Sequence, residues 1–476
     1  MKKNIIKLAL LLIVVTGFSC KAELSDININ PNATEDPLPD YLLTATEKKA
    51  ADLYWGSENN YNSSLLFVQH WAKIQYTEPD CYILSNSSFT SLWNTGYTQI
   101  ITNLNTILDL TDEKANSNYK GVALTLRSWA FLLLTDAYGD IPYSEVGKSI
   151  IPKYDNQKDV YFGLLADLEN SLTLFNEKGQ KISGDIIYSG NILSWKKFAN
   201  ALRLRIALRI SDKEPEKAKS VIASVLNGSA GLINSNTETA QFIYTASPQQ
   251  NPFSASFETR DDYRVSKTVV DRLSAINDPR LAVFAQKPTD TSVPNYVGVP
   301  NGLSTTDANN LGFAKTSKPG SYFLKAESPA VFYSYAEVLF NLSEAAARGF
   351  TTQNSEELYN KAITASLNQF GITNSTVISS YLSQPDVQYD KTNFKKSIGE
   401  QKWISLYGQG LEAFAEWRRL DYPVLTAGPA SVLDNKFPVR FIYPGAEQSL
   451  NGINYKAAVA HQGTDNLITK LWFDAY

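Results

Sequence analysis

The sequence predicts a mainly α-helical fold, in which helix pairs similar to tetratricopeptide repeats form a scaffold and an irregular, loop-rich region lies over it. Apolar residues recur at helical spacing through most of residues 41–227 and 328–422. Between these stretches, residues 228–327 are rich in Gly, Pro, Asn, Ser and Thr, and helical spacing almost disappears. Helix pairs of about 40 residues indicate repeat stacking, although the strict tetratricopeptide consensus is absent.

The first residues have the layout of an export signal. Lysines precede an unbroken apolar run at residues 8–15, which is too short to span a bilayer because spanning needs about 20 apolar residues. Cys20 then follows a small residue, as in the lipobox of bacterial lipoproteins, where the cysteine is acylated and becomes the first residue of the mature chain. We therefore expect a signal peptide at 1–19 and a lipidated N-terminus with a polar tether at 20–40. The alternative is a plain secreted protein in which Cys20 has no role.

Composition narrows the classes of function. If Cys20 carries lipid, Cys81 is the other cysteine, so no disulfide framework holds the fold. The two histidines, His70 and His461, cannot build a zinc site by themselves, and we expect each to be structural or on the surface. The net charge of −4 gives no indication of nucleic-acid binding. The 26 tyrosines and 8 tryptophans offer flat rings with a polar edge, which suits a sugar- or peptide-binding protein.

Three stretches of the first half have helical spacing of apolar residues. They are 91–110, 120–142 and 191–210, and the second is the strongest, with Gly139 near its end. Ser194 is a plausible N-cap of the third helix. Three arginines interrupt the apolar residues of that helix, and we expect a solvated face or buried pairs with acids in preference to an anion site: Arg203, Arg205 and Arg209.

The second half begins with loops and returns to helices. Within 228–327 only residues 262–276 have helical spacing, and such long irregular regions are usually functional or disordered. Ser328 and Pro329 are expected to cap and begin the next helix, which ends at Gly349. Two further predicted segments complete the scaffold, a helix at 356–370 closed by Gly371 and a helix pair at 394–420 broken at Gly408 and Gly410.

The sequence lacks the common catalytic motifs, and we expect no catalytic residue, no cofactor and no metal. Glu412 and Glu416 share one face of a predicted helix, and a glycosidase needs two carboxyl groups about 5 to 10 Å apart. Two arginines follow them at once, which favours an ion-paired helix in a packed bundle. Asp261 and Asp262 could ligate a metal or pair with Arg260, and pairing is the preferred interpretation.

Candidate ligand-binding residues are mostly aromatic and lie in predicted loops. Binding residues concentrate on loops that a rigid scaffold positions, and flat amphipathic rings offer large contact areas. A packing role is an equal alternative for each residue taken singly, whereas some members of the set are expected to face a site. The set is Trp55, Tyr76, Tyr82, Asp262, Tyr263, Tyr296 and Tyr322.

Four long motifs, in order along the chain, resemble the SusD/RagB family of nutrient-binding outer-membrane lipoproteins from Bacteroidetes. The first two are similar to a family helix with its turn and to an alanine-rich tetratricopeptide helix: RSWAFLLLTDAYGDIPYSE (127–145) and YAEVLFNLSEAAARG (335–349). The other two are similar to a later helix pair and to the C-terminal segment: QKWISLYGQGLEAFAEWRRLDYP (401–423) and RFIYPGAEQSLN (440–451). The resemblance extends over essentially the whole chain.

The resemblance implies a single SusD-like domain at 41–476. Its expected parts are a helical scaffold at about 41–227 and 328–422, a loop-rich ligand-facing region at about 228–327 and a C-terminal segment at 423–476. The quoted motifs belong to the scaffold, so the resemblance by itself assigns no ligand-binding residue.

The resemblance also implies a function without chemistry. The protein would be anchored by lipid in the outer membrane, face the cell surface, capture a nutrient and deliver it to a SusC-like TonB-dependent transporter. An oligosaccharide is the first expectation for the ligand, and a peptide is the alternative. Two other hypotheses stay open. One is a surface glycosidase that uses Glu412 and Glu416, and the other is a structural helical-repeat protein that functions only through protein–protein contacts.

Overall fold

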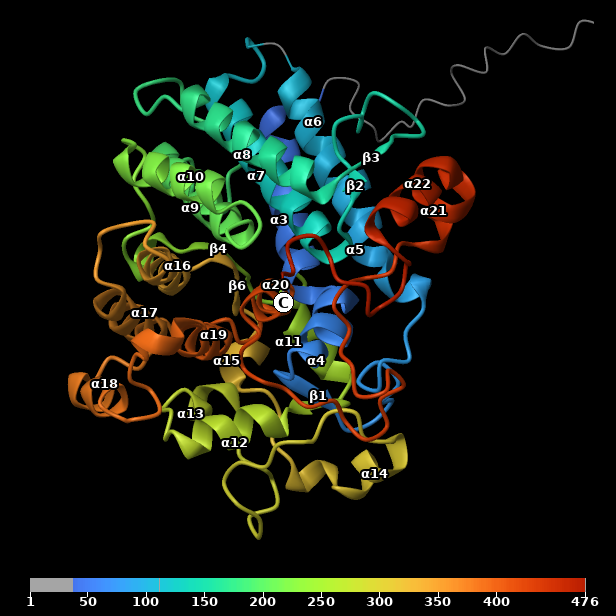
Figure 1. Cartoon of the computed structure of the whole chain (residues 1–476), viewed down its shortest axis with the longest axis vertical. Helices are drawn as coiled ribbons and strands as arrows, with labels where there is room; N and C mark the ends of the chain where they lie inside the picture. The colour runs from blue at the N-terminus through green and yellow to red at the C-terminus, as the bar shows by residue number, and fades with distance from the viewer. Residues whose placement is uncertain (1–36, 111, 476) are drawn as a thin grey trace, which may run out of the picture. The chain divides into compact units, whose positions relative to one another are not determined.

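Helices account for most of the regular structure in the computed structural model, which describes residues 37–110 and 112–475 (Figure 1). The predicted signal peptide at 1–19, Cys20 and most of the predicted tether at 20–40 lie outside the described residues. In the described part, no helix combines the length and the apolar character that crossing a membrane requires. The mainly α-helical prediction is confirmed.

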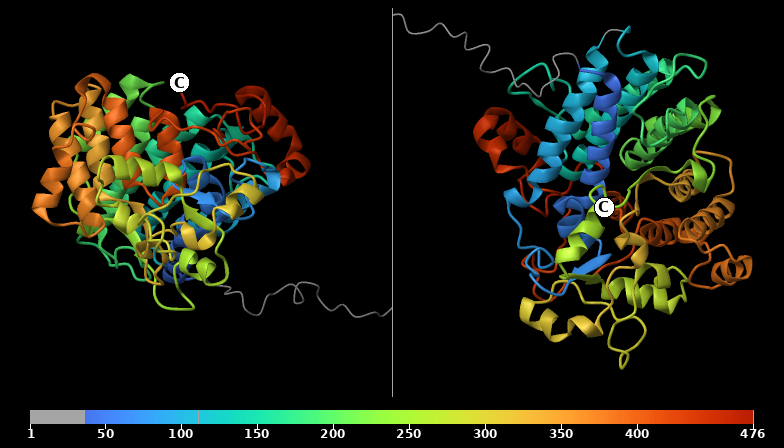
Figure 2. Two further views of the ribbon diagram at one scale, coloured as in Figure 1. Left: turned by 90° about the horizontal axis from the view of Figure 1, so that it is seen from below. Right: turned by 180° about the vertical axis from the view of Figure 1, so that it is seen from behind.

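The N-terminal helices pack side by side (Figure 1 and Figure 2, right). The predicted helix at 91–110 is a continuous helical stretch with a π-helical turn, Gly96–Ile101, in its middle. The predicted helix at 120–142 starts earlier because the Asn116 side chain caps it by accepting from two backbone N–H groups, and it ends before Gly139, whose φ is +89°. The helices of this group are α3 (Pro39–Gly56), α5 (Thr90–Thr95), α6 (Thr102–Asp109), α7 (Ser117–Tyr138) and α8 (Gln157–Leu174).

Successive helix pairs continue from this group and confirm the tetratricopeptide-like scaffold. In each pair the second helix packs on the first, and α9 links the two halves of the scaffold because it also contacts α7, α8 and α16. The helices are α9 (Ile192–Arg209) with α10 (Pro215–Asn227), α16 (Tyr335–Ala347) with α17 (Ser355–Gln369), and α19 (Phe394–Ser405) with α20 (Gly410–Leu420). Positive φ angles at Gly349 and Gly371 follow the ends of α16 and α17, as predicted.

Two predicted helix starts are wrong. Asn191, not Ser194, caps α9, because its side chain accepts the N–H of Ser194 at 3.1 Å. Ser328 and Pro329 do not begin α16, because β6 (Pro329–Tyr333) pairs with β4 (Ala240–Ile243) in an antiparallel ladder. The cap of α16 is Ser334, whose hydroxyl accepts the N–H of Glu337. A proline is compatible with the first residue of a strand, and the backbone of the residues after it pairs with β4.

The region 228–327 contains more regular structure than predicted. Residues 262–276 are not one helix but β5 (Tyr263–Val265) followed by α12 (Lys267–Ala275), because β5 pairs with β1 (Trp71–Lys73). Short helices interrupt the loops of this region: α11 (Pro252–Thr259), α13 (Leu281–Phe284), α14 (Thr305–Asn310) and α15 (Ser321–Leu324). The other α-helices and strands of the described residues are α4 (Leu65–Phe67), β2 (Ile141–Pro142), β3 (Tyr154–Asp155), α18 (Ser375–Leu382), α21 (Gly445–Leu450) and α22 (Gly452–Gln462).

The interior accounts for much of the aromatic content. Trp71, Trp129 and Trp195 are completely buried. Tyr54 of α3 lies edge-on against Trp129 of α7, and both contact Phe332 of β6. Buried rings of this size dominate core energetics, so a high aromatic count by itself does not distinguish core packing from a ligand surface.

Candidate functional site

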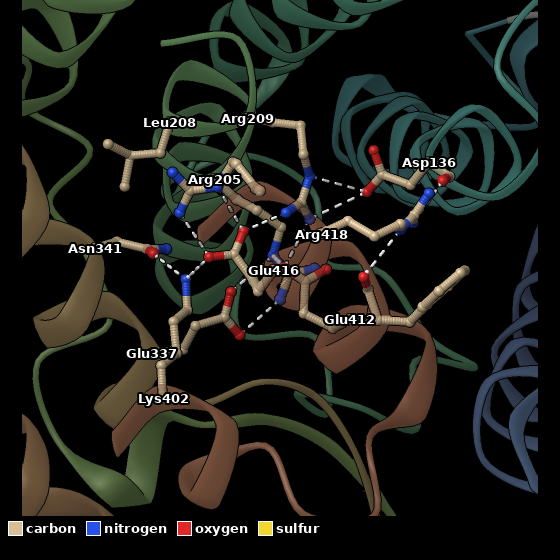
Figure 3. A network of polar contacts seen from close by, with 12 residues as sticks. Asp136, Arg205, Leu208, Arg209, Glu337, Asn341, Lys402, Glu412, Glu416 and Arg418 are labelled. Atoms are coloured by element: carbon tan, nitrogen blue, oxygen red, sulfur yellow. Dashed lines mark hydrogen bonds and ion pairs between the residues drawn. The ribbon is translucent and has the colours of Figure 1, made fainter. Parts of the chain in front are cut away.

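The predicted carboxylate pair Glu412 and Glu416 lies in a buried network of ion pairs between helices (Figure 3). Arg209 of α9 binds both carboxylates of α20, with 2.7 Å to Glu412, and also lies 3.1 Å from Asp136 of α7. Arg205, one turn earlier, pairs with Glu337 of α16 at 2.7 Å. The expectation of buried pairs with acids is confirmed for these two arginines.

The electrostatics of Glu416 and Glu344 in this network favour a structural role. Burial by itself raises the pKa of Glu416, but Arg419, Lys402 and Arg209 outweigh it and hold that pKa well below its usual value. Arg419 likewise outweighs burial at Glu344 and lowers the pKa of that carboxyl to about 2. A general acid needs a raised pKa, and these groups are instead fixed as anions between cations. The ion-paired interpretation of the carboxylate pair is therefore confirmed.

The other polar candidates for chemistry are also paired. Asp262 lies 2.9 Å from the buried Lys73 amine and 3.7 Å from Arg260, and Asp261 pairs with Arg264 at 2.9 Å. In the described ranges, no group of three or more His, Cys, Asp and Glu side chains could hold a metal ion.

Both histidines have structural partners. His70 is buried, its Nε2 lies 3.0 Å from the carbonyl oxygen of Trp403, and burial lowers its pKa to about 3. His461 lies on α22, and its Nδ1 is 2.6 Å from the buried Asp140 carboxylate. Because His70 lies in the interior and His461 is exposed on α22, the structural or surface interpretation of the two histidines is confirmed.

Four of the predicted ligand-binding residues have interior side chains. Trp55 is 3% exposed and packs on Phe253, and the Tyr82 ring lies between Phe67 and Phe437. Asp262 and Tyr263 are also buried, with the Lys73 amine 4.4 Å from the Tyr263 ring centre. Tyr82 also lines a surface cavity together with Ile83 and Val432. A ligand on the surface cannot contact the other three groups unless the chain rearranges. Packing is their role in this structure, and ligand contact stays a prediction.

The other three predicted residues reach the surface in different degrees. Tyr76 is 56% exposed and has a φ of +55°. Tyr296 is half-buried in the loop before β-bridge residue Val299. The half-buried ring of Tyr322 lies 5.0 Å from Phe323 and 5.3 Å from Phe370, and burial raises its pKa to about 12. The structure therefore does not bring the predicted set together into one site.

Tyr76 and Tyr296 belong to loops that meet at one end of the scaffold (Figure 1, bottom, and Figure 2, right). We call this surface, residues 74–88, 286–320 and 424–437, the loop face. Hydrogen bonds of 3.0, 2.8 and 3.1 Å join its loops in pairs: Thr77 to Thr305, Ala430 to Gly302 and Val432 to Cys81. The backbones approach so closely that a Cβ on Gly428 would lie 2.0 Å from the Asn301 carbonyl oxygen.

Asn301 connects the loop face to the interior. Its amide nitrogen donates to Asp80 and to the Trp71 carbonyl oxygen, each at 2.8 Å, and its oxygen accepts from Ser266 at 2.6 Å. Burial raises the pKa of Asp80 to about 6, although the hydrogen bond from Asn301 opposes that rise. The three polar partners are buried, so the loops that carry them are held in one arrangement.

The loop face includes an apolar surface, which continues onto Ile442, Leu467 and Ile468. Ile83 and Val432 are 54% and 55% exposed, and they line a cavity of about 550 Å³ together with Leu84, Leu433, Ile442, Leu467 and Ile468. These aliphatic residues are not among the ligand-binding residues predicted from the sequence. The available signal was a pair of adjacent large apolar residues in a loop, as at Ile83 with Leu84 and at Val432 with Leu433. No local signal could have selected Asn301, whose role depends on partners far away in the sequence.

Helix pairs that carry a face of loops joined by hydrogen bonds define the class of this molecule as a helical-repeat protein. A family model described as starch-binding and associating with the outer membrane matches residues 31–444, and the chain therefore belongs to the SusD-like family. The resemblance to SusD/RagB proteins that the sequence motifs carry is confirmed. No curated protein matches the chain.

Solved structures share the fold over nearly the whole chain. A chitin-binding protein is 29% identical, with a TM-score of 0.83 over 92% of this chain and 100% of that chain. A SusD homolog from Bacteroides uniformis is 25% identical, also with a TM-score of 0.83 over 92% of this chain and 100% of its own. A chitin-binding SusD homolog from Flavobacterium johnsoniae is 23% identical, has a TM-score of 0.79 over 92% of this chain and 97% of that chain, and adds likeness of fold alone.

Proposed function

We propose that this protein is a lipid-anchored, surface-exposed binding protein that captures an oligosaccharide and delivers it to a SusC-like TonB-dependent transporter of the outer membrane. The observation that carries the proposal is the loop face, where loops joined by hydrogen bonds carry the exposed ring of Tyr76 and where Ile83 and Val432 line a cavity. The family description and the chitin-binding protein of similar structure support a saccharide as the ligand. The predicted lipobox at Cys20 supports the anchor.

Capture would need no chemical step. A tyrosine ring stacks on the C–H face of a sugar, while its hydroxyl stays in water. Phe313, which is also partly exposed on the loop face, adds a second ring on the same side of the scaffold. Because hydrogen bonds already order the loops, little conformational freedom is lost when a ligand binds. Release to the transporter then follows from moderate affinity and does not require bond cleavage.

A peptide is the second candidate for the ligand, and one observation favours it. The cavity that Ile83 and Val432 line on the loop face has mainly aliphatic walls, which suit apolar peptide side chains better than sugar hydroxyls. A peptide could extend from this cavity across the exposed Tyr76 ring. The two ligand classes therefore differ in which part of the surface they use.

Calorimetric titration of the processed full chain, purified in detergent, separates these functions. The panel is oligomers of N-acetylglucosamine, oligomers of glucose and a defined set of peptides, and each mixture is sampled for breakdown products. Saturable binding of a saccharide, weakened by Tyr76→Ala and without products, is the expected result. Binding of peptides alone, weakened by Val432→Asp, would replace the saccharide proposal. Product formation would revive the glycosidase hypothesis.

A further inference from the structure

We propose that the protein has a second saccharide-binding groove, on the helical scaffold and outside the loop face. The groove lies between α17 and the turn at residues 234–236, and it encloses a cavity of about 610 Å³. This volume is within the usual range of about 300 to 1,000 Å³ for small-molecule sites. The inference shares the ligand class of the proposed function, but it does not depend on the loop face.

One wall of the groove is a polar stripe on α17. Asn360, Thr364 and Asn368 are four residues apart, so their side chains share one face of the helix. Asn236 in the opposite wall donates from Nδ2 to the carbonyl oxygen of Ala365 at 3.0 Å, which fixes the turn against the helix. Tyr335, the first residue of α16, adds a half-buried aromatic ring to the lining.

Apart from Asn236, the asparagine side chains of this groove make no hydrogen bond within the described part of the chain. The side chains of Asn234, Asn360 and Asn368 and the hydroxyl of Tyr335 form no hydrogen bond with any other described residue. Asn360 lies in the middle of α17, where asparagine is a poorer helix former than alanine, and the cap of this helix is a different residue, Asn354. Neither helix stability nor capping therefore explains why carboxamides occupy this stripe.

The chemistry of the lining selects a neutral, hydroxyl-rich ligand. Each carboxamide offers both donors and an acceptor, which matches the alternating donor and acceptor capacity of neighbouring sugar hydroxyls. The charged residues of the stripe, Glu357 and Lys361, pair with each other at 2.6 Å and leave no uncompensated charge for a phosphate or a basic peptide. The Tyr335 ring can stack on a sugar face. A saccharide satisfies all three properties.

A second groove would change how long glycans are held. Two sites on one chain convert the second binding event into an intramolecular one, so a polymer that reaches both is retained more strongly than a short oligomer. The groove would thus increase the concentration of polymer at the surface of the protein, independently of the site on the loop face.

Calorimetry on the processed full chain tests this inference, with hexamers of N-acetylglucosamine and of glucose as probes. The double change Asn360→Ala and Asn368→Ala should keep or raise the melting temperature, because alanine favours the helix. It should remove one of two saccharide sites per chain or weaken that site at least tenfold, and Tyr76→Ala should affect only the other site. The matched control is Asn103→Ala on α6, which should leave both sites unchanged.

The possible outcomes separate this inference from the proposed function. A single site that is weakened by Tyr76→Ala and insensitive to the double change would overturn the second groove alone. Binding that disappears with the double change but not with Tyr76→Ala would support the groove and overturn the assignment of capture to the loop face. No saccharide binding by the unmodified chain at millimolar concentration would overturn both. Loss of binding to a protein partner, with saccharide binding unchanged, would assign the stripe to a protein contact and overturn the groove.

Discussion

The guanidinium of Arg209 on α9 and the carboxylate of Glu412 on α20 meet at 2.7 Å in the interior, although 203 residues separate them in the chain. Around this pair, helices from both halves of the scaffold contribute charges that neutralise one another (Figure 3). This buried network of ion pairs fixes the positions of the helix pairs relative to one another. The helix pairs in turn position the loop face and the groove.

Removal of Arg209 should destabilise the whole domain. Arg209→Met leaves Asp136, Glu412 and Glu416 buried with less compensating charge, and breaking such a buried pair costs about 3 to 5 kcal/mol of unfolding free energy. Urea unfolding followed by circular dichroism measures the change. Lys267→Ala, which breaks an exposed pair with Asp271, is the matched control and should leave the midpoint unchanged. Equal midpoints for both variants would contradict the role of the network.

Trp55 and Tyr76 should give opposite results when each is changed to alanine. Trp55 is buried, so Trp55→Ala should lower the unfolding free energy by about 3 to 5 kcal/mol. Tyr76 is exposed, so Tyr76→Ala should change it by less than about 0.5 kcal/mol and should weaken saccharide binding about tenfold. Thermal unfolding and calorimetric titration measure the two effects. A folded Trp55→Ala variant with wild-type stability and weakened saccharide binding would instead indicate that Trp55 contacts the ligand.

Asn301→Ala should loosen the loop face. The change removes the amide that joins Asp80, Trp71 and Ser266, and unsatisfied buried partners cost about 1 to 3 kcal/mol each. We expect faster amide hydrogen exchange in residues 74–88 and weaker ligand binding, while α9 and α20 keep their protection. Uniformly faster exchange across the scaffold would show that Asn301 supports global stability and not the local arrangement of loops.

His70 should make the protein less stable in acid. The folded chain holds its ring neutral with a pKa of about 3, whereas an unfolded histidine titrates near its usual pKa of about 6.5. As pH falls from 6.5 toward 3, the unfolded state binds the proton and the folded state does not, so stability decreases, by up to about 4 kcal/mol. The difference between the wild type and His70→Phe in urea midpoints over this range isolates the effect. A difference that does not change with pH would exclude His70 as its source.

Asp80 acts in the opposite direction in part of the same range. Its pKa of about 6 in the folded chain is above its usual value, so the folded state binds the proton first and gains stability as pH falls below 6. The wild-type pH profile therefore combines opposing contributions, which is why the comparison with the His70→Phe variant is needed.

Cys20→Ala should release the protein from the membrane. Acylation of this cysteine is the proposed anchor, and the helices of the described part include no candidate membrane span. Cell fractionation in a strain that lacks the transporter measures the change, because binding to the barrel could otherwise retain the protein. Cys81→Ala is the matched control and should stay with the membrane. Retention of Cys20→Ala in the membrane fraction would contradict lipidation as the anchor.

The sequence by itself determined the scaffold. Apolar spacing predicted α7, α9, α16, α17 and α20 because each helix buries one face. The residues of that face recur at helical spacing within the segment itself. The glycines after α16 and α17 were predictable for the same reason, since a left-handed residue at a helix end is a local requirement. Even the pairing of Arg205 and Arg209 with acids could be expected, because a charge on a buried helix needs a partner.

The tertiary structure alone decided which candidate residues are available to a ligand. Trp55 and Tyr76 are both aromatic residues next to polar stretches, yet one packs on Phe253 and the other is exposed. The strand β6 and the contact of Asn301 with Asp80 depend on partners that lie far away in the chain. The exposure of a side chain and its long-range contacts depend on how distant segments of the chain pack together. Local sequence patterns therefore cannot predict them.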